Sequence, residues 1–303
     1  MYQEVGDAVV AGLGVGALYA LIAMGYTLIL AASGVFNFAQ GSLVMGGALL
    51  MYALWQVSHV PLIGVLAILA VGGALAGAIT HLVAVLPVTN RRGVRSLTEG
   101  TLVTTFGFGL VLNTVAGMTF GYSVQPVNSY ITSQPIDVIG LQIPPIYLVM
   151  VGATLVAATI MEVVLHRTRA GLVLRAVVDD AEGAGLAGIR LSRVVLVAFG
   201  LAGALAAVAG ALLAPISFAS IDIGTQLVLL GFAGMAIGGF GSFTGALIGG
   251  ILVGLTSTVV PIWLPAIYVN LIIYGGMTVM LILRPRGLFG SAGRFGAAAL
   301  REV

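Results

Sequence analysis

The sequence predicts an all-α membrane protein, a polytopic bundle of about eight to ten transmembrane helices. Apolar residues make up 60% of its 303 residues and charged residues only 7%, and the mean hydropathy is +1.16. Soluble domains carry about a quarter charged residues. The few charges in this chain are too sparse to cover a soluble surface. We therefore expect lipid to surround most of it, in a single transmembrane domain over residues 1–303.

Nine apolar segments account for the predicted spans. A spanning helix needs about 20 apolar residues. The first segment has no basic start and is too long for a cleaved signal peptide, so we expect it to be a membrane helix. The 44 glycines allow helices to approach closely. The clear candidates are residues 8–32, 61–86, 99–120, 143–165, 193–214 and 265–283, and the shorter ones are 41–57, 225–240 and 243–260.

The arginines predict the orientation of the bundle. All 12 positive residues are arginine, and they fall between 91 and 95, between 167 and 193, and between 284 and 301. Positively charged loops stay in the cytoplasm. Nine crossings with the N-terminus outside would place every arginine, and the C-terminus, on the cytoplasmic side. If a single short segment failed to cross, the arginines would be divided between the two faces.

The composition excludes several kinds of chemistry. The chain has no lysine, which a P-loop needs for its phosphates, and no cysteine for thiolate chemistry. None of its three histidines stands near carboxylates at ligand spacing, so we expect no metal site. A net charge of +2 gives no basic footprint for nucleic acid. We therefore expect a protein that is not an enzyme and that binds no cofactor itself.

A glycine-rich run at 231–250, GFAGMAIGGFGSFTGALIGG, is the expected place for broken helices. Irregular backbone at membrane depth is tolerated only where protein or a water-filled cavity covers it. Gly238, Gly239 and Gly241 are the candidates for the break. The alternative is that these glycines only let helices pack closely.

The segment at 166–193 predicts a structured cytoplasmic loop. Leu172, Arg175, Ala176, Asp179 and Asp180 recur at three- and four-residue spacing, which is typical of an amphipathic helix. Glycines that follow would loosen or end it, and a second short helix is expected from residue 184 into the next span. The loop is either a solvated connector or a docking element laid into a groove of a cytoplasmic partner.

Four motifs follow one another along the chain. The loop carries R-x-G-x-x-x-R-A-x-x-x-D followed by G-I, and the others are residues 16–48 with Asn-Phe-Ala-Gln-Gly at 37–41, the stretch at 236–250, and RPRGLFG at 284–290. Together they resemble permeases of ABC importers of the branched-chain amino acid type. The ending soon after RPRGLFG resembles the shorter of the two permease types. The resemblance implies that ATPase coupling falls on Arg169, Gly171, Arg175, Ala176, Asp179, Asp180, Gly188 and Ile189.

The resemblance also implies an assembly in the bacterial cytoplasmic (inner) membrane. The expected partners are two ATPase subunits that bind ATP and Mg, a second permease that is a different chain or a copy of this one, and an extracytoplasmic substrate-binding protein. Movement of the loop would switch the bundle between inward-open and outward-open states. Branched-chain amino acids are the expected substrates, with urea, short amides or other small polar solutes as alternatives.

Polar residues inside the spans are candidates for the translocation path, since hydrocarbon offers them no partner. The strongest are Asn37 and Gln40, because a helix break there would expose backbone groups to a zwitterionic solute. Each could instead form a hydrogen bond between helices. An ion-coupled secondary transporter and a passive channel remain alternatives, although ion-coupled carriers usually hold ionisable groups near the bilayer centre. The full set of path candidates is Asn37, Gln40, Thr104, Asn113 and Gln226.

Overall fold

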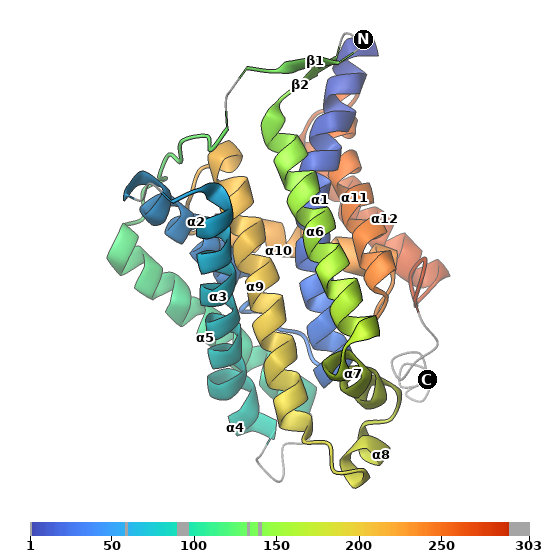
Figure 1. Cartoon of the computed structure of the whole chain (residues 1–303). Helices are drawn as coiled ribbons and strands as arrows, with labels where there is room; N and C mark the ends of the chain where they lie inside the picture. Colours follow the sequence, from blue (N-terminus) through green and yellow to red (C-terminus); the bar gives the residue numbers. More distant parts are fainter. Residues whose placement is uncertain (1, 58–59, 90–96, 132–133, 139–140, 291–303) are drawn as a thin grey trace.

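The chain forms a bundle of helices in which all nine predicted apolar segments are helical. The computed structural model describes residues 2–57, 60–89, 97–131, 134–138 and 141–290. Figure 1 shows the elements along the chain. They are α1 (Tyr2–Ser33), α2 (Gln40–Val57), α3 (Leu62–Thr80), the π-helix η1 (His81–Val85), α4 (Leu86–Thr89), α5 (Leu97–Phe120), β1 (Ile136–Val138), β2 (Leu141–Ile143), α6 (Pro145–Arg167), α7 (Arg169–Asp179), α8 (Ala181–Leu186), α9 (Leu191–Ser217), α10 (Ile223–Gly238), α11 (Phe243–Val259), the 3-10 helix η2 (Val260–Ile262) and α12 (Ile267–Leu283).

Six helical stretches in the described part of the chain are long and apolar enough to cross a membrane. They comprise α1, α3 with η1 and α4, α5 from Glu99, α6, α9, and α11 with η2. The shorter apolar helices include α10 with 16 residues and α12 with 17. The helix lengths at the C-terminal end therefore differ from the prediction. The segment predicted as short, 243–260, forms a stretch of 20 residues together with η2, whereas the segment predicted as a clear span, 265–283, forms the shorter helix α12.

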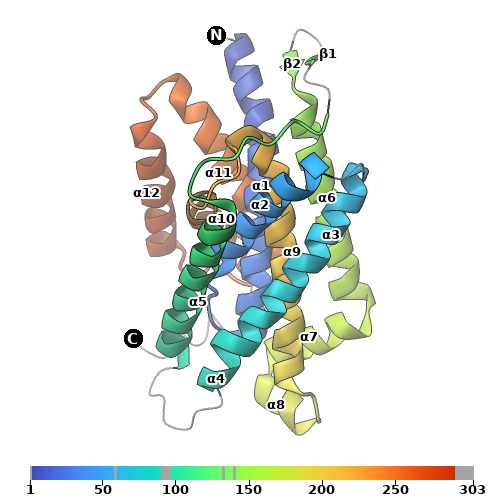
Figure 2. The same ribbon diagram turned by 90° about the vertical axis from the view of Figure 1, so that its left-hand side faces the viewer.

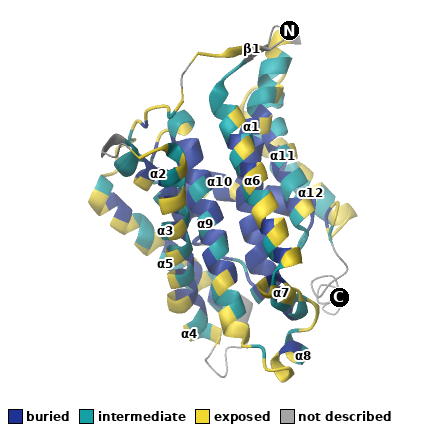
Figure 3. Ribbon diagram, in the orientation of Figure 1, coloured by how far each residue is buried: buried dark blue, intermediate teal, exposed yellow. Residues whose placement is uncertain are grey.

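Helix α1 lies at the centre of the bundle. It contacts α6, α9, α10 and α11, while α2 and α3 both pack on α9 (Figure 2). The middle of α1 and the second half of α9 are almost entirely buried, whereas α3, α5 and α6 carry exposed residues on their outer faces (Figure 3). Many of these exposed residues are large and apolar. Exposed apolar surface of this extent is stable in lipid and not in water.

Glycine lets the central helices touch backbone to backbone. A Cβ added at Gly250 would overlap the backbone of Ala20, where α11 crosses α1. A Cβ added at Gly73 would overlap the carbonyl oxygen of Gly203, where α3 crosses α9. Between membrane helices, association depends on such close packing because burial from lipid provides little driving force.

The described arginines lie near one end of the bundle, which we call the arginine end. Helix α6 finishes there at Arg167, α7 follows and α9 begins there. Glu162 of α6 and Phe243 of α11 line one cavity, so the turn between α10 and α11 is at the same end. Arg284 and Arg286 follow α12 and lead into a segment that binds this turn. Arg91, Arg92, Arg95, Arg294 and Arg301 lie outside the described residues.

The segments between α5 and α6 cover the other end. Strands β1 and β2 form an antiparallel hairpin, which the sequence reading did not predict. Gln125 pairs with Ala219 after α9, with nitrogen–oxygen distances of 2.8 and 2.9 Å in the two directions. The Tyr130 hydroxyl donates to the carbonyl oxygen of Leu212 at 2.9 Å, and burial raises the pKa of Tyr130 above its usual value. This covering segment is thus fixed to the end of α9.

Candidate translocation path and coupling surface

The connection between α1 and α2 carries two polar side chains that are buried inside the bundle. Asn37 and Gln40 are both 0% exposed. Gln40 Nε2 donates to the carbonyl oxygen of Ala202 in α9 at 3.0 Å, and Asn37 Nδ2 lies 3.4 Å from Gln40 Oε1. The Ala39 N–H donates to Asn37 Oδ1 at 3.1 Å. Helix α1 ends at Ser33 and α2 begins at Gln40, so the chain leaves the helical conformation here. Gln40 holds the connection against α9, and Asn37 holds it together from within.

A cavity of about 430 Å³, which we call the central cavity, lies beside this connection. Its size falls within the range of small-molecule sites. Of the described residues that line it, none is acidic, basic or histidine. The walls are therefore mostly apolar and aromatic, with three uncharged polar residues besides Tyr26. The lining residues are Tyr26, Phe36, Phe38, Gly41, Ser42, Phe106, Gly109, Leu110, Asn113, Thr225, Val228, Leu229 and Phe232.

Two helix N-termini meet at the central cavity. Helix α2 begins at Gln40 and α10 at Ile223, and the two are in contact because a Cβ at Gly224 would overlap the carbonyl oxygen of Gly41. Gly41 and Thr225 line the cavity from the first turns of these helices. Helix N-termini carry a positive partial charge, so both favour an anionic group of a solute.

The predicted path residues separate into different places. Asn113 lines the central cavity, and its buried Oδ1 has no hydrogen-bond partner among the described residues. Thr104 Oγ1 donates to the carbonyl oxygen of Ala84 at 2.6 Å and so joins α5 to η1. Gln226 lines another cavity, of about 210 Å³, near the end of α9. Asn37 and Gln40 line neither of these two cavities.

Sequence reading identified Asn113 but missed two other polar residues that line the central cavity. Ser42 Oγ donates to the carbonyl oxygen of Gly109 at 3.0 Å, linking α2 to α5, and Thr225 is exposed on α10. Each lies in the first turn of its helix, at the N-terminus that meets the central cavity. That position, more than polarity alone, is the signal that identifies them.

The glycine-rich run contains the second break. Helix α10 ends at Gly238, and Gly239 and Gly241 have φ of +124° and +79°, which glycine tolerates best. The chain after α12 covers this break, since the N–H groups of Leu288 and Phe289 donate to the carbonyl oxygens of Ile237 and Gly238 at 3.0 and 2.8 Å. The tail thus satisfies carbonyls at the end of α10 that have no partner within the helix.

The loop after α6 folds back on the bundle as the predicted amphipathic helix. Thr168 forms the turn, since its Oγ1 donates to the carbonyl oxygen of Val164 at 2.6 Å and accepts from the N–H of Gly171 at 3.2 Å. Gly171 is buried against the end of α6, and Leu174 and Val177 are buried on the same face of α7. Helix α7 is therefore attached to α6 by a tight turn and an apolar face.

The opposite face of this loop is open. Arg169, Arg175 and Asp179 are exposed, while Ala176 is half-buried. Leu172 and Leu186 are also exposed, at 61% and 88%. Sequence reading treated Leu172 as part of the helical pattern and did not select Leu186, whose exposure depends on where α8 ends.

Asp180 separates the two short helices. Its Oδ1 accepts from the N–H groups of Glu182 and Gly183 at 3.1 and 3.0 Å, so it caps α8. The second helix was expected to start at residue 184 and continue into the next span. That expectation is wrong, because this cap starts α8 at Ala181 and the helix stops at Leu186. Gly188, with φ of +85°, and the half-buried Ile189 lie between α8 and α9.

Histidine and carboxylate side chains form no cluster of three among the described residues. His166 pairs with Glu162 at 3.0 Å on the exposed surface of α6. His81 is buried in η1 beside Phe199, and neither of its ring nitrogens has a hydrogen-bond partner among the described residues. Nothing in this arrangement provides a metal centre in the described part of the chain.

Comparison with known proteins identifies the family. The chain is 27% identical over 295 residues to the high-affinity branched-chain amino acid transport system permease protein LivH of Escherichia coli (strain K12), covering 92% of this chain and 93% of the relative. It is 26% identical to BraD, the corresponding permease protein of Pseudomonas aeruginosa PAO1, over 92% of this chain and 94% of the relative. It is 28% identical to the probable branched-chain amino acid transport permease protein LivH of Methanocaldococcus jannaschii, over 90% and 89%.

These relatives match along nearly the whole chain. The family model described as "Branched-chain amino acid transport system / permease component" matches residues 8–282. That range begins within α1 and ends within α12, and it includes the central cavity, both helix breaks and α7. This multi-pass membrane protein belongs to the family of permease components of branched-chain amino acid transport systems.

Proposed function

We propose that this chain is the membrane-spanning subunit of an ATP-driven importer of branched-chain amino acids. The observation that carries the proposal is the loop at 166–193, which is anchored to α6 on one face and exposes Leu172 and Leu186 on the other. A solvated connector has no need to expose large apolar side chains on ordered helices. A helix that docks in a groove of a partner requires them.

The partners in this proposal are two ATPase subunits, a second permease and an extracytoplasmic binding protein, with ATP and Mg held by the ATPases. The arginine end would face the cytoplasm of a bacterial cell. Closure of the ATPases would move α7 and α8 as one unit. The tight turn at Thr168 would transmit this movement to α6. A packed bundle responds to such a push by switching between two states.

The central cavity supports the choice of substrate. Its apolar and aromatic walls suit a branched aliphatic side chain, and the N-termini of α2 and α10 suit a carboxylate. Asn113 Oδ1, which has no partner among the described residues, could accept from an ammonium group. Urea and short amides lack an apolar side chain and would leave the aromatic wall unused, so they are the weaker alternative.

The test is ATP-driven uptake of labelled leucine by proteoliposomes that contain the protein with its ATPases, second permease and binding protein. We expect Leu186→Asp to reduce uptake and ATPase stimulation at least tenfold, because burial of one leucine contributes about 1.5–3 kcal/mol. The matched control is Leu264→Asp, at an exposed leucine between η2 and α12, which should leave both unchanged.

Leu186 is almost fully exposed, so its replacement should not alter folding. Unchanged coupling in Leu186→Asp would remove the proposed role of α8. Uptake by the purified chain alone, driven by a proton or sodium gradient, would refute the importer assignment.

A further inference from the structure

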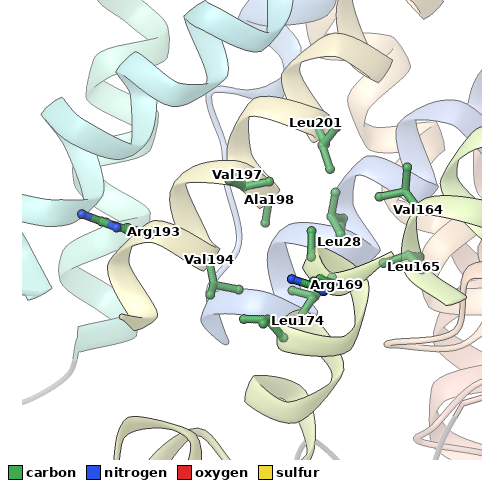
Figure 4. Close-up of a pocket in the computed structure, with 13 residues that line it drawn as sticks. Leu28, Val164, Leu165, Arg169, Leu174, Arg193, Val194, Val197, Ala198 and Leu201 are labelled. Carbon is green, nitrogen blue, oxygen red and sulfur yellow. The ribbon is translucent and has the colours of Figure 1, made fainter. Parts of the chain in front are cut away.

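A second cavity, of about 300 Å³, opens at the arginine end between α1, α6, α7 and α9; we call it the α6–α7 groove. Eleven of its 13 lining residues are apolar or glycine, and the other two are arginines. Figure 4 shows Arg169 beside Leu28 and Leu174, and it shows Arg193 extending from the first turns of α9 away from the groove.

The chemistry of the groove argues against a soluble ligand. Sites for small molecules combine apolar walls with a few placed polar groups that fix the ligand. Among the described residues, the walls here provide no polar side chain other than Arg169 and Arg193, which are both exposed. The groove also borders the lipid-facing surface, since Val163 and Val197 beside it are exposed on α6 and α9. A ligand would enter most easily from the bilayer.

We propose that the α6–α7 groove binds one anionic phospholipid of the surrounding bilayer. An acyl chain would lie against Leu28, Leu165 and Leu174, and Arg169 would bind the phosphate. Arg193 is on the first turn of α9 and exposed, so rotation of its side chain brings a second cation toward the same headgroup. Basic pockets between membrane helices commonly hold anionic headgroups in this way. The first turn of α7, which starts at Arg169, adds the positive end of a helix.

The position of the groove gives the lipid a mechanical role. Its walls include three residues of the α7 face, Gly171, Val173 and Leu174, and residues of the fixed helices α1 and α9. A bound acyl chain would therefore fill the space across which α7 must move relative to the bundle. This inference stands apart from the identity of the transported solute, because binding of lipid does not require transport.

The test compares lipid binding by the purified protein in detergent, using native mass spectrometry with phosphatidylglycerol and phosphatidylcholine of identical acyl chains. We expect phosphatidylglycerol to bind more tightly. The double variant Arg169→Gln with Arg193→Gln should lose about fivefold in affinity for each arginine, and should bind the two lipids equally. Arg175→Gln is the matched control, since Arg175 is exposed on the same helix and does not line the groove.

A second variant tests the acyl-chain part of the site. Ala170 lines the groove and is exposed, so Ala170→Trp should fill the space and reduce binding of both lipids without unfolding the protein. Equal binding of the two lipids by the unaltered protein, or unchanged binding in the double variant, would overturn the proposal. A protein complex could also overturn the proposal. If a complex with a second copy or with a partner persists after delipidation and is lost in Ala170→Trp, the groove is a protein contact and not a lipid site.

Discussion

Replacement of Gly171 by alanine tests whether the docking of α7 on α6 transmits force. The Cβ of alanine would overlap the carbonyl oxygens of Val164 and Leu165, which are backbone atoms that cannot turn aside. Helix α7 would have to lift from the end of α6. Overpacking of this kind costs about 1–3 kcal/mol, which exceeds the gain of up to about 1 kcal/mol that alanine brings to a helix. We therefore expect a displaced α7.

Gly185→Ala is the matched control for this change. Gly185 lies in α8 of the same loop, and a Cβ there would meet no atom within 4 Å. Alanine at that position should only stabilise α8, by up to about 1 kcal/mol. The two variants thus share one chemical change and differ in whether space exists for it.

The assays are a spin-label distance between α6 and α7, with labels at exposed Glu162 and Leu172, and ATPase activity stimulated by the loaded binding protein. Gly171→Ala should change the distance and lower the stimulation at least fivefold, whereas Gly185→Ala should change neither. If both variants retain the distance and the stimulation, the close contact at Gly171 does not position the loop and the reasoning fails.

Two further changes test the buried polar groups by thermal unfolding in detergent. Gln40→Leu should destabilise the protein by about 1–3 kcal/mol, because it removes the hydrogen bond to Ala202 from a fully buried position. The control is Gln226→Leu at an exposed position, which should change stability by no more than about 0.5 kcal/mol. Equal effects would contradict the role of Gln40 in holding the connection against α9. His81→Leu should raise stability by about 1 kcal/mol or more, because both ring nitrogens are buried without a partner among the described residues, and a lower midpoint would show that the ring has a partner.

Much of the fold could be predicted because lipid makes the pattern simple. Runs of apolar residues mark helices, and glycines near 238–241 mark the break between α10 and α11. The π-helix at His81–Val85 and the short α12 were not predictable in this way, since both depend on how neighbouring helices pack. The start of α8 was missed for a local reason: Asp180, which fitted the helical period of the preceding helix, is the cap of α8.

The candidate path was harder to predict than the candidate coupling surface. Helix α7 has one buried and one exposed face, and a three- to four-residue period reveals such a helix in sequence. A polar residue inside a span gives no such signal. Gln40 bonds to α9, Thr104 joins α5 to η1 and Asn113 lines the central cavity, yet all three are polar residues in apolar surroundings. Their different roles follow from the neighbouring helices that each one meets in the folded bundle.

The N-termini of α2 and α10 offer a way for a bundle with so few charges to bind a zwitterion, which is the kind of substrate in the proposed function. Helices α2 and α10 begin within the protein, and their N-termini meet at the central cavity, so partial positive charge is available there without any ionised side chain. Fixed charges would hold a solute tightly and would cost free energy when it leaves. The helix dipoles bind a solute only weakly, and this binding is lost as soon as the two helix N-termini separate. A tilt of α6 passed through α1 to the buried connection at Asn37 and Gln40 would therefore be enough to release the solute.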